Sequence, residues 1–274
     1  KANVAKSRFI TGMSHEMRAG LNSILGYSQL LLRAPALPGA CREDVRTIGR
    51  AGEHLSSLVD GLLELSRIEA GKLRLEQEAV SLESLFDDLV RMFRPLAAAR
   101  GLAFHYRVVG RLPRHVHADS KRLRQVVINL VSNAIKFTDH GAVTLTVRHQ
   151  HELGTISVHD TGPGIPAEDQ ARIFDPFERV TPHDDREGIG LGLAIVRLLA
   201  DLMGGEIQVR SAPGEGSEFL VRLYLPAVSA AAVPRKDMPA PVVPTGARVL
   251  IVDDRVAHRA VLRGFLAPLD QIGR

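Results

Sequence analysis

A histidine followed by a glutamate stands near the N-terminus, inside a stretch with the periodicity of a packing helix. Over 9–32 the sequence reads FITGMSHEMRAGLNSILGYSQLLL, and its apolar residues recur at heptad spacing: Ile10, Met13, Met17, Leu21, Ile24 and Leu31. His15 lies opposite that seam, so we expect its ring to face solvent, with Glu16 beside it able to accept a ring proton. Taken alone, the stretch favours an ordinary surface histidine, and the later motifs reverse that preference.

Three polar residues share one face of a helix expected over 120–137. Asn129, Asn133 and Lys136 are separated by four and three residues. Because Asn is a poor helix former, two of them on one face call for a reason. An amide oxygen is a hard ligand suited to Mg²⁺, and a lysine one turn away can meet a phosphate oxygen. A solvated polar face is the plainer alternative.

Three glycine clusters follow in order. DTGPGI at 160–165 comes directly after an expected strand, where Asp160 can accept the exocyclic amine of adenine while Gly162 and Gly164 let the backbone approach a flat ring. Gly188, Gly190 and Gly192 open an apolar helix whose N-terminus suits phosphate. The run GEGS at 214–217 forms a turn between the last two strands. Each cluster alone is typical of a turn, but together with the polar helix they indicate a nucleotide site.

The helix that carries His15 is expected to be followed by a second long helix. The first is expected over 3–33 and ends before Pro35 and Pro38, and a second apolar-periodic run follows with Ile48, Ala51, Leu55, Leu58, Leu62 and Leu65. A single antiparallel hairpin cannot shield both seams from water, so we expect a second copy to complete a four-helix dimer bundle. Packing of the hairpin on the rest of its own chain is the alternative.

After Gly71 the pattern changes to short strands and amphipathic helices. Strands are expected over 72–75, 102–109, 142–148, 155–159, 206–210 and 218–225, and helices over 82–99, 120–137 and 190–203, the first two capped by Ser81 and Asp119. This order predicts a two-layer α/β sandwich with a mostly antiparallel sheet, and an α+β fold class for the chain. The expected domains are 1–70, 71–226, an Ala/Pro-rich linker over 227–247, and 248–274.

Composition excludes several classes. The net charge is +4 and the basic residues are scattered, so nucleic-acid binding gains no support. The single cysteine excludes an internal disulfide framework, and no Cys/His cluster has zinc spacing. No apolar run approaches the ~18 residues of a membrane span, so we expect a cytoplasmic chain whose parent protein is anchored, if at all, through N-terminal regions absent here.

Together the motifs resemble the catalytic core of a bacterial sensor histidine kinase of the hybrid type. SHEMR at 14–18 resembles the phosphoacceptor box, 129–136 the N box, FDPFER at 174–179 the F box, and the three glycine clusters the family's glycine boxes. The resemblance implies a Bergerat-type ATP-binding fold of the histidine-kinase ATPase kind, a lid between Arg179 and Gly188, and a dimeric helical bundle. RVLIVDD at 248–254 resembles the first strand of a receiver domain, in which Asp253 and Asp254 would bind Mg²⁺; the chain stops before a phosphoacceptor aspartate.

The resemblance also implies roles. His15 would attack the γ-phosphate of ATP, with Glu16 taking the other ring proton. Asn133 would hold Mg²⁺ with Asn129 beside it, Asp160 would read adenine with Ser217 as a water-mediated neighbour, and Lys136 and the lid's Arg186 would contact phosphate. The nucleotide-binding set is Asn129, Asn133, Lys136, Asp160, Gly162, Gly164, Phe177, Arg186, Gly188, Gly190, Gly192 and Ser217.

Two positions depart from the family pattern. Ala19 and Gly20 stand where Thr-Pro is usual, and the missing hydroxyl predicts weak phosphatase activity. Glycine in a helix interior costs about 0.5–1 kcal/mol, which loosens the helix after His15. The resulting expectation is an autokinase that passes phosphate to a receiver aspartate, in cis or on a separate response regulator. The alternatives are a degenerate kinase kept as a dimeric scaffold and a chaperone- or topoisomerase-like ATPase, although those lack the His-Glu pair.

Overall fold

The computed structural model describes residues 2–34, 37–178 and 190–228, with side chains from residue 17 onward except that of residue 40. These residues belong to two compact units that divide between Ala70 and Gly71. Arg186, Gly188 and everything after residue 228, including the expected linker and the receiver-like run, lie outside the described residues.

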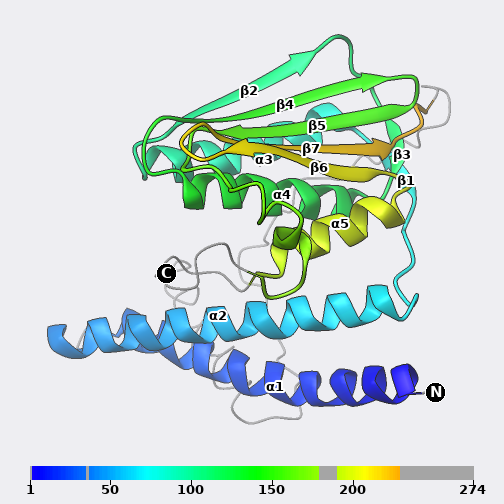
Figure 1. Ribbon diagram of the computed structural model, residues 1–274. Helices are drawn as coiled ribbons and strands as arrows, with labels where there is room; N and C mark the ends of the chain where they lie inside the picture. The colour runs from blue at the N-terminus through cyan, green and yellow to red at the C-terminus, as the bar shows by residue number, and fades with distance from the viewer. Residues whose placement is uncertain (1, 35–36, 179–189, 229–274) are drawn as a thin grey trace, which may run out of the picture. The chain divides into compact units, whose positions relative to one another are not determined.

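The first unit is an antiparallel helical hairpin. Helix α1 (Ala2–Arg33) and helix α2 (Gly39–Glu69) run side by side in opposite directions (Figure 1). Leu21, Val59 and Leu63 form its buried cluster. A Cβ added to Gly52 would lie only 3.0 Å from the Leu25 side chain, so glycine allows the helices to approach closely. Gly71, with φ of +64°, follows the end of α2, as expected for a helix stop.

Large apolar side chains remain exposed on the hairpin at heptad spacing. They are Met17, Ile24 and Leu31 of α1 and Ile48, Leu55 and Leu62 of α2, between 37% and 51% exposed. The apolar residues of the expected seams therefore form two groups. Leu21 packs inside the hairpin, whereas these six residues face outward. One hairpin alone leaves this second apolar face in water, as predicted.

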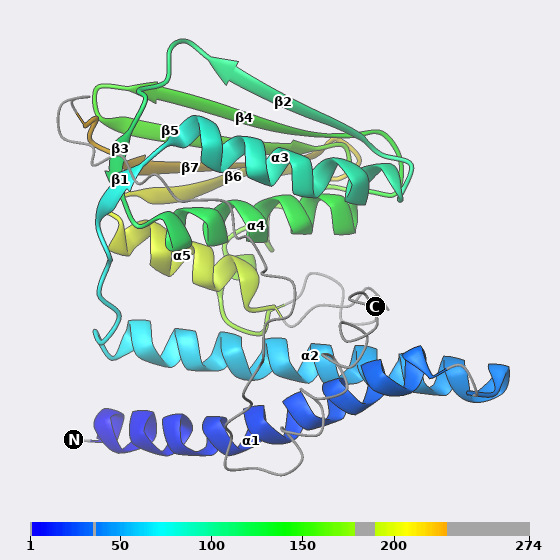
Figure 2. The ribbon, with the colours of Figure 1, turned by 180° about the vertical axis from the view of Figure 1, so that it is seen from behind.

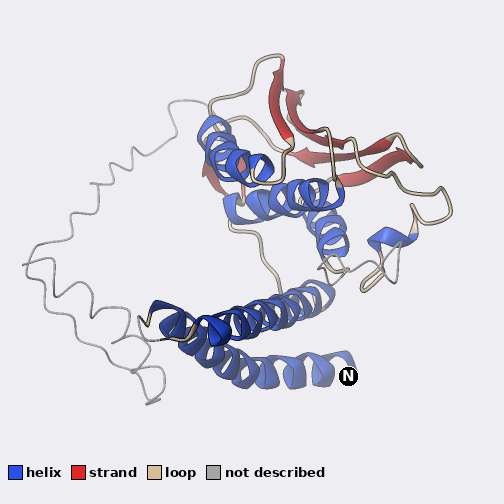
Figure 3. Ribbon diagram, turned by 90° about the vertical axis from the view of Figure 1, so that its left-hand side faces the viewer, coloured by secondary structure: helices blue, strands red, loops and turns tan. Residues whose placement is uncertain are grey.

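The second unit is a two-layer α/β sandwich. Its five-stranded sheet has the order β2-β4-β5-β7-β6, and β2 is parallel to β4 while the other neighbours are antiparallel. The helices cover one face of the sheet (Figures 2 and 3). The elements are β2 (Ala103–Val109), β4 (Ala142–Gln150), β5 (Leu153–Asp160), β6 (Glu206–Ala212) and β7 (Gly216–Tyr224), with α3 (Leu82–Ala98), α4 (Ser120–Phe137) and α5 (Gly192–Leu202). The predicted fold class is confirmed.

The core lies between the sheet and the helices. On β4, Val143, Leu145 and Val147 are buried while the residues between them are not, so one face of the strand meets the helices. Helix α4 meets this face with apolar residues at helical spacing, including Leu123 and Leu130. The buried layer fixes the rotation of α4 and so determines which of its residues point elsewhere.

Two expected caps are present, and one expected strand is not. The Ser81 hydroxyl accepts from the Ser84 amide at 3.3 Å, and the Asp119 carboxylate from the Arg122 amide at 3.0 Å. Residues 72–75 alternate in polarity but do not form a strand, so that prediction is wrong. A small two-stranded sheet forms instead from β1 (Glu78–Val80) and β3 (Val116–Ala118), because strand formation requires a pairing edge that alternation alone cannot reveal.

Three remaining features complete the fold. A 3-10 turn, η1 (Arg172–Phe174), precedes the residues outside the description. None of the helices in the described ranges is long and apolar enough to cross a membrane. The other expected helices and strands agree with the structure to within two residues at each end.

Candidate functional site

The polar face of α4 meets the start of α5. The side-chain amide of Asn129 donates to the Gly192 carbonyl oxygen at 3.3 Å. A Cβ on Gly192 would lie 3.8 Å from Asn129 Cγ and 3.9 Å from Asn133 Nδ2, so both asparagines border this glycine. In the part of the chain that is described, the Asn133 amide forms no hydrogen bond, which leaves its oxygen available to a ligand.

The N-terminus of α5 is suited to an anion. The preceding residue, Leu191, has helical backbone angles and no side chain caps the helix. The first backbone amides of a helix lack partners within it and, with the helix dipole, favour negative charge. Gly190 has a φ of +73°, a conformation in which a Cβ would meet the Phe177 backbone. The backbone amides at the start of α5 therefore lie next to the asparagines of α4.

Asp160 lies at the end of β5 and is only 4% exposed. Its Oδ1 accepts from the Gly162 amide at 2.9 Å, and the strand register places it opposite Ser217 of β7. Burial raises the pKa of Asp160, while hydrogen bonds from the backbone of Gly162 and Ser217 and the charge of His159 act in the opposite direction. A buried carboxylate held in this way is suited to accept a hydrogen bond from a ligand that excludes water.

The first and third glycine clusters touch. The Gly214 amide donates to the Pro163 carbonyl at 2.7 Å. Gly164 and Gly216 have φ of +74° and +84°, and a Cβ on either would collide with a backbone carbonyl, that of Ala212 or Asp160 respectively. Glycine is thus required at both positions to bring the two loops together beside Asp160.

Ser211 and Gln170, which the sequence did not single out, hold the loop that follows Asp160. The Ser211 hydroxyl accepts from the Ile165 amide at 2.8 Å and donates to the Gly216 carbonyl at 2.7 Å, and it lies 3.0 Å from the Ser217 hydroxyl. Gln170 donates to the carbonyls of Ile165 and Ser211 at 3.0 and 2.8 Å. Both are ordinary polar residues in sequence, and only the fold reveals their partners.

Phe177 and Gly190 lie on either side of residues 179–189, which the structure does not describe, and their backbones are hydrogen-bonded. The Phe177 amide donates to the Gly190 carbonyl at 3.0 Å, and Phe177 itself has a φ of +68°, unusual for a side chain of this size. Its side chain is 53% exposed. The main-chain hydrogen bond fixes where the expected lid leaves and re-enters the described fold.

Lys136 and an unpredicted arginine lie at the end of α4. Arg100 Nη1 donates to the carbonyls of Ile135 and Lys136 at 2.8 and 3.0 Å and so caps the helix C-terminus. The Lys136 ammonium lies 4.4 Å from the centre of the Phe137 ring. A Cβ on Gly162 would come within 3.1 Å of the Phe137 carbonyl, so this helix end is in contact with the Asp160 loop.

His15 and Glu16 lie within α1, but their side chains are outside the description. One turn further on, the Arg18 guanidinium pairs with Asp60 of α2 at 2.6 Å. No group of three or more His, Cys, Asp or Glu residues that could hold a metal occurs among the described residues. The side-chain oxygen of Asn133 is of the hard kind that suits Mg²⁺.

The first and third glycine clusters thus meet beside a buried carboxylate, and Gly192 lies against the polar face of α4, whose C-terminal end contacts the Asp160 loop. A purine amine suits Asp160, and a polyphosphate suits the α5 N-terminus and the asparagines.

Two family models match the chain. Residues 5–71 match the "His Kinase A (phospho-acceptor) domain", and residues 118–227 match the "Histidine kinase-, DNA gyrase B-, and HSP90-like ATPase" family.

Curated relatives point the same way. The chain is 39% identical over 233 residues to the sensor protein GacS of Pseudomonas syringae pv. syringae, an alignment covering 82% of this chain and 26% of that protein. It is 36% identical over 227 residues to the signal transduction histidine-protein kinase BarA of Escherichia coli strain K12, covering 80% and 25%. With the virulence sensor protein BvgS of Bordetella bronchiseptica it shares 37% identity over 290 residues, covering 98% and 23%. The chain spans about a quarter of the length of these relatives.

Solved structures agree with the fold. Full-length ShkA in complex with AMPPNP superposes with a TM-score of 0.71 at 35% identity, covering 81% of this chain and 47% of that one. The Acinetobacter baumannii histidine kinase AdeS gives a TM-score of 0.55 at 25% identity, covering 77% and 97%.

Proposed function

The chain belongs to the sensor histidine kinases, and from that premise we propose that it is an ATP-dependent kinase that phosphorylates its own His15 and passes the phosphoryl group to a receiver aspartate. The observation that carries the proposal is that Asn133 of α4 borders Gly192 while the end of the same helix contacts the loop that holds Asp160, in a chain whose other unit bears the SHEMR helix.

Asp160 is proposed to recognise adenine. Its Oδ1 accepts from the Gly162 amide, and because the two oxygens of a carboxylate together offer about four lone pairs, Asp160 can also accept the exocyclic amine. Gly162 and Gly164 keep side chains away from the plane of the base, and Ser217 is proposed to act through a water molecule. The related ShkA structure is a complex with AMPPNP, an adenine nucleotide analogue, which supports the choice of ATP.

The phosphates are proposed to lie between α4 and α5. Asn133 offers its amide oxygen to Mg²⁺, with Asn129 holding Gly192 in place, and the ion when bound would neutralise charge on the β- and γ-phosphates. Lys136 and the backbone amides at Gly190 and Gly192 would contact phosphate oxygens. Arg186 and Gly188 are proposed for the same set on sequence alone, and Phe177 for the lid base.

His15 is the proposed nucleophile. One ring nitrogen forms a bond to the γ-phosphorus as the bond from that phosphorus to the β–γ bridging oxygen breaks, so ADP departs with the electron pair. Glu16 accepts the proton from the other ring nitrogen, which keeps the attacking nitrogen electron-rich. The phosphoryl group then moves to an aspartate of a receiver domain, either downstream of residue 248 in the same protein or on a response regulator.

The proposed working form is a homodimer. The exposed row of Met17, Ile24 and Leu31 with Ile48, Leu55 and Leu62 would become the centre of a four-helix bundle. The proposed location is the cytoplasm, where ATP and a receiver are available; a membrane anchor would belong to other parts of the parent protein.

Labelling with ATP that carries a tagged γ-phosphate tests the proposal. The wild type should acquire an acid-labile, base-stable label, and His15→Gln and Asn133→Ala should lose it, whereas Asn133→Ala should retain the hairpin dimer. A wild-type protein that remains a folded dimer but acquires no label would instead favour the degenerate scaffold.

A further inference from the structure

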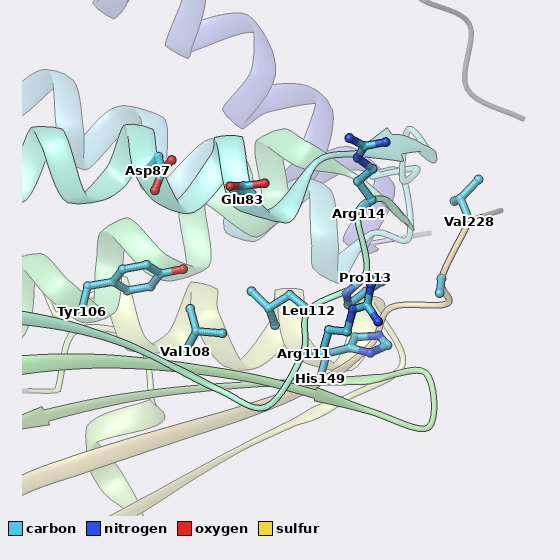
Figure 4. A pocket seen from close by; sticks show the side chains of 11 residues that line it. Glu83, Asp87, Tyr106, Val108, Arg111, Leu112, Pro113, Arg114, His149 and Val228 are labelled. Atoms are coloured by element: carbon cyan, nitrogen blue, oxygen red, sulfur yellow. The ribbon is translucent and has the colours of Figure 1, made fainter. Parts of the chain in front are cut away.

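A groove on the second unit lies between helix α3 and strand β2. It has a volume of about 1000 Å³, and the loop after β2 also lines it (Figure 4). Val108, Leu112 and Pro113 supply apolar lining, and Val108 is 45% exposed. None of the residues of the proposed nucleotide site lines this groove.

The strand that forms one wall of the groove has a free edge. β2 is the first strand in the order β2-β4-β5-β7-β6, and among the described strands it pairs only with β4. The backbone groups on its other side therefore have no strand to bond with. Tyr106 and Val108 are two residues apart, so both lie on the face of β2 that lines the groove (Figure 4). An extended peptide beside β2 would place alternate side chains between β2 and α3.

One end of the groove is acidic. Glu83 and Asp87 lie one turn apart on α3, over the ring of Tyr106 (Figure 4). Neither carboxylate forms an ion pair with any residue in the described ranges. Burial, followed by the charges of Asp87 and Glu83, raises the pKa of Tyr106 to about 12, so its hydroxyl stays protonated. Two like charges one helical turn apart repel each other, so this end would be stabilised by an ammonium or guanidinium group.

The other end of the groove is basic. Arg111 and Arg114 line it together with His149 (Figure 4). Neither arginine is paired with a carboxylate in the part of the chain that the structure describes. The His149 Nε2 lies 2.8 Å from the Leu225 carbonyl oxygen and donates to it, which fixes the ring in the wall. Because a guanidinium group matches the geometry of a carboxylate, this end suits an acidic side chain.

The two ends are close enough for one short segment to reach both. Tyr106 and Arg111 are five residues apart in the sequence, so their Cα atoms are at most about 18 Å apart. An extended peptide rises about 3.3 Å per residue, so about five residues cover this length.

We propose that the groove binds an extended segment of a partner protein, which adds to the free edge of β2 and carries two opposite charges. A basic residue of the segment would meet Glu83 and Asp87, and an acidic residue within about five positions would meet Arg111 and Arg114. A segment with charges of one sign would be repelled at one end, so the groove discriminates between partners. This contact belongs to the second unit and does not depend on phosphorylation of His15.

Selection of random octapeptides displayed on phage, with the whole chain as the target, tests the proposal. Enriched peptides should carry Lys or Arg and Asp or Glu at a constant separation of up to about five positions, with Val, Ile or Thr between them. A synthetic peptide of the enriched sequence should bind Glu83→Lys/Asp87→Lys at least about tenfold more weakly than the wild type, because two exposed attractions become repulsions. Fluorescence anisotropy measures this. Replacing the basic residue of the peptide by glutamate should restore binding to that variant, which also shows that the variant is folded.

Asp88→Asn is the matched control. Asp88 lies on the same helix but does not line the groove, and it pairs with Arg91 and Arg124 at 2.9 and 3.2 Å, so the variant should bind the peptide as the wild type does.

Hydrogen exchange tests the strand addition separately. Exchange over β2 should slow when the peptide is added, whereas exchange over β6, the opposite edge of the sheet, should not change. Peptide binding that survives Glu83→Lys/Asp87→Lys, or protection at β6 instead of β2, would overturn the proposal. A library that yields no enriched peptide, or peptides without the charge pair, would overturn it as well.

Discussion

Asp160 lowers the stability of the fold when it is ionised, at a position where it is proposed to bind adenine. Because its pKa is raised in the folded protein, ionising this carboxyl costs folding free energy. The cost is absent below the unfolded value near 3.8, grows as the pH rises toward the folded pKa and is complete above it. Burial in the core disfavours the ionised carboxylate of Asp160.

Asp160→Asn should therefore separate stability from binding. The single oxygen of the asparagine can accept from the Gly162 amide, but its NH₂ group would then face the adenine amine. We expect ATP affinity to fall by a factor of roughly 10 to 100, while the melting temperature at pH 7 equals or exceeds that of the wild type. Calorimetric titration and thermal unfolding measure both, and unchanged ATP affinity would show that Asp160 does not read the base.

Ala19→Thr should add phosphatase activity. The helix around residue 19 is continuous, and Ser23 donates to the Ala19 carbonyl, so a threonine fits the helix without a new backbone strain. With a phosphorylated receiver and ADP, we expect the variant to release phosphate at least about tenfold faster than the wild type. The reason is that the threonine hydroxyl would position the attacking water, and general acid–base catalysis of this kind contributes at least that much to a rate. Ala19→Val is the control of equal shape without the hydroxyl; rapid release by the wild type would contradict the prediction.

The sequence predicts part of the site because that part follows local rules. Asn129, Asn133 and Lys136 share a face by helical spacing, and the glycines mark turns. The roles of Ser211 and Gln170 could not be predicted, because their side chains bond to backbone groups far away in the sequence. The Ser211 hydroxyl bonds to the Ile165 amide, 46 positions away, and the Gln170 amide bonds to the Ser211 carbonyl, 41 positions away. Such contacts depend on strand order, which no local pattern encodes.

At the level of elements, the helices follow their sequence more closely than the short strands do. The caps at Ser81 and Asp119 set the starts of α3 and α4, so those starts are readable. β3 is three residues long and depends on β1 and on Ala227 for its pairing. A strand of this length has too few residues for alternation to be detected.

Leu55→Glu should separate the dimer. Leu55 is 45% exposed in the single hairpin, so the charge harms little within one chain, but in the bundle it would be buried. We expect the dimer dissociation constant to rise roughly 100-fold or more, equivalent to about 2.7 kcal/mol. Sedimentation velocity measures this. Leu96→Glu, at a position 52% exposed on α3, is the control and should remain dimeric; an unaffected Leu55→Glu dimer would mean that the subunits associate elsewhere.

Arg100→Ala should loosen the end of α4. The carbonyls of Ile135 and Lys136 lose their hydrogen-bond donor, so the free energy of unfolding, measured in urea, should fall by about 1–2 kcal/mol. The ATP concentration for half-maximal labelling should also rise, since this helix end touches the Asp160 loop. Arg91→Ala removes a guanidinium that is 75% exposed and should cost under about 1 kcal/mol. Equal losses from the two variants would show that the cap has no special effect.

At the scale of the whole molecule, the chemistry is divided between two units. The hairpin carries His15 and Glu16, and the sandwich carries Asp160, Asn133 and the glycine loops. Neither unit alone holds both the proposed nucleophile and the proposed nucleotide site, so the proposed reaction requires the two units to meet. Sequence predicts each unit because each has its own periodicity.

The most direct measurement of the central claim locates the phosphate. After incubation with ATP and Mg²⁺, the chain is digested at neutral pH, and tandem mass spectrometry identifies the modified residue in the peptide that contains SHEMR. The account predicts one phosphoryl group on the His15 ring, absent when Asp160→Asn lowers nucleotide binding at limiting ATP. Phosphate on another residue, or on none although ATP binds at Asp160, would contradict it.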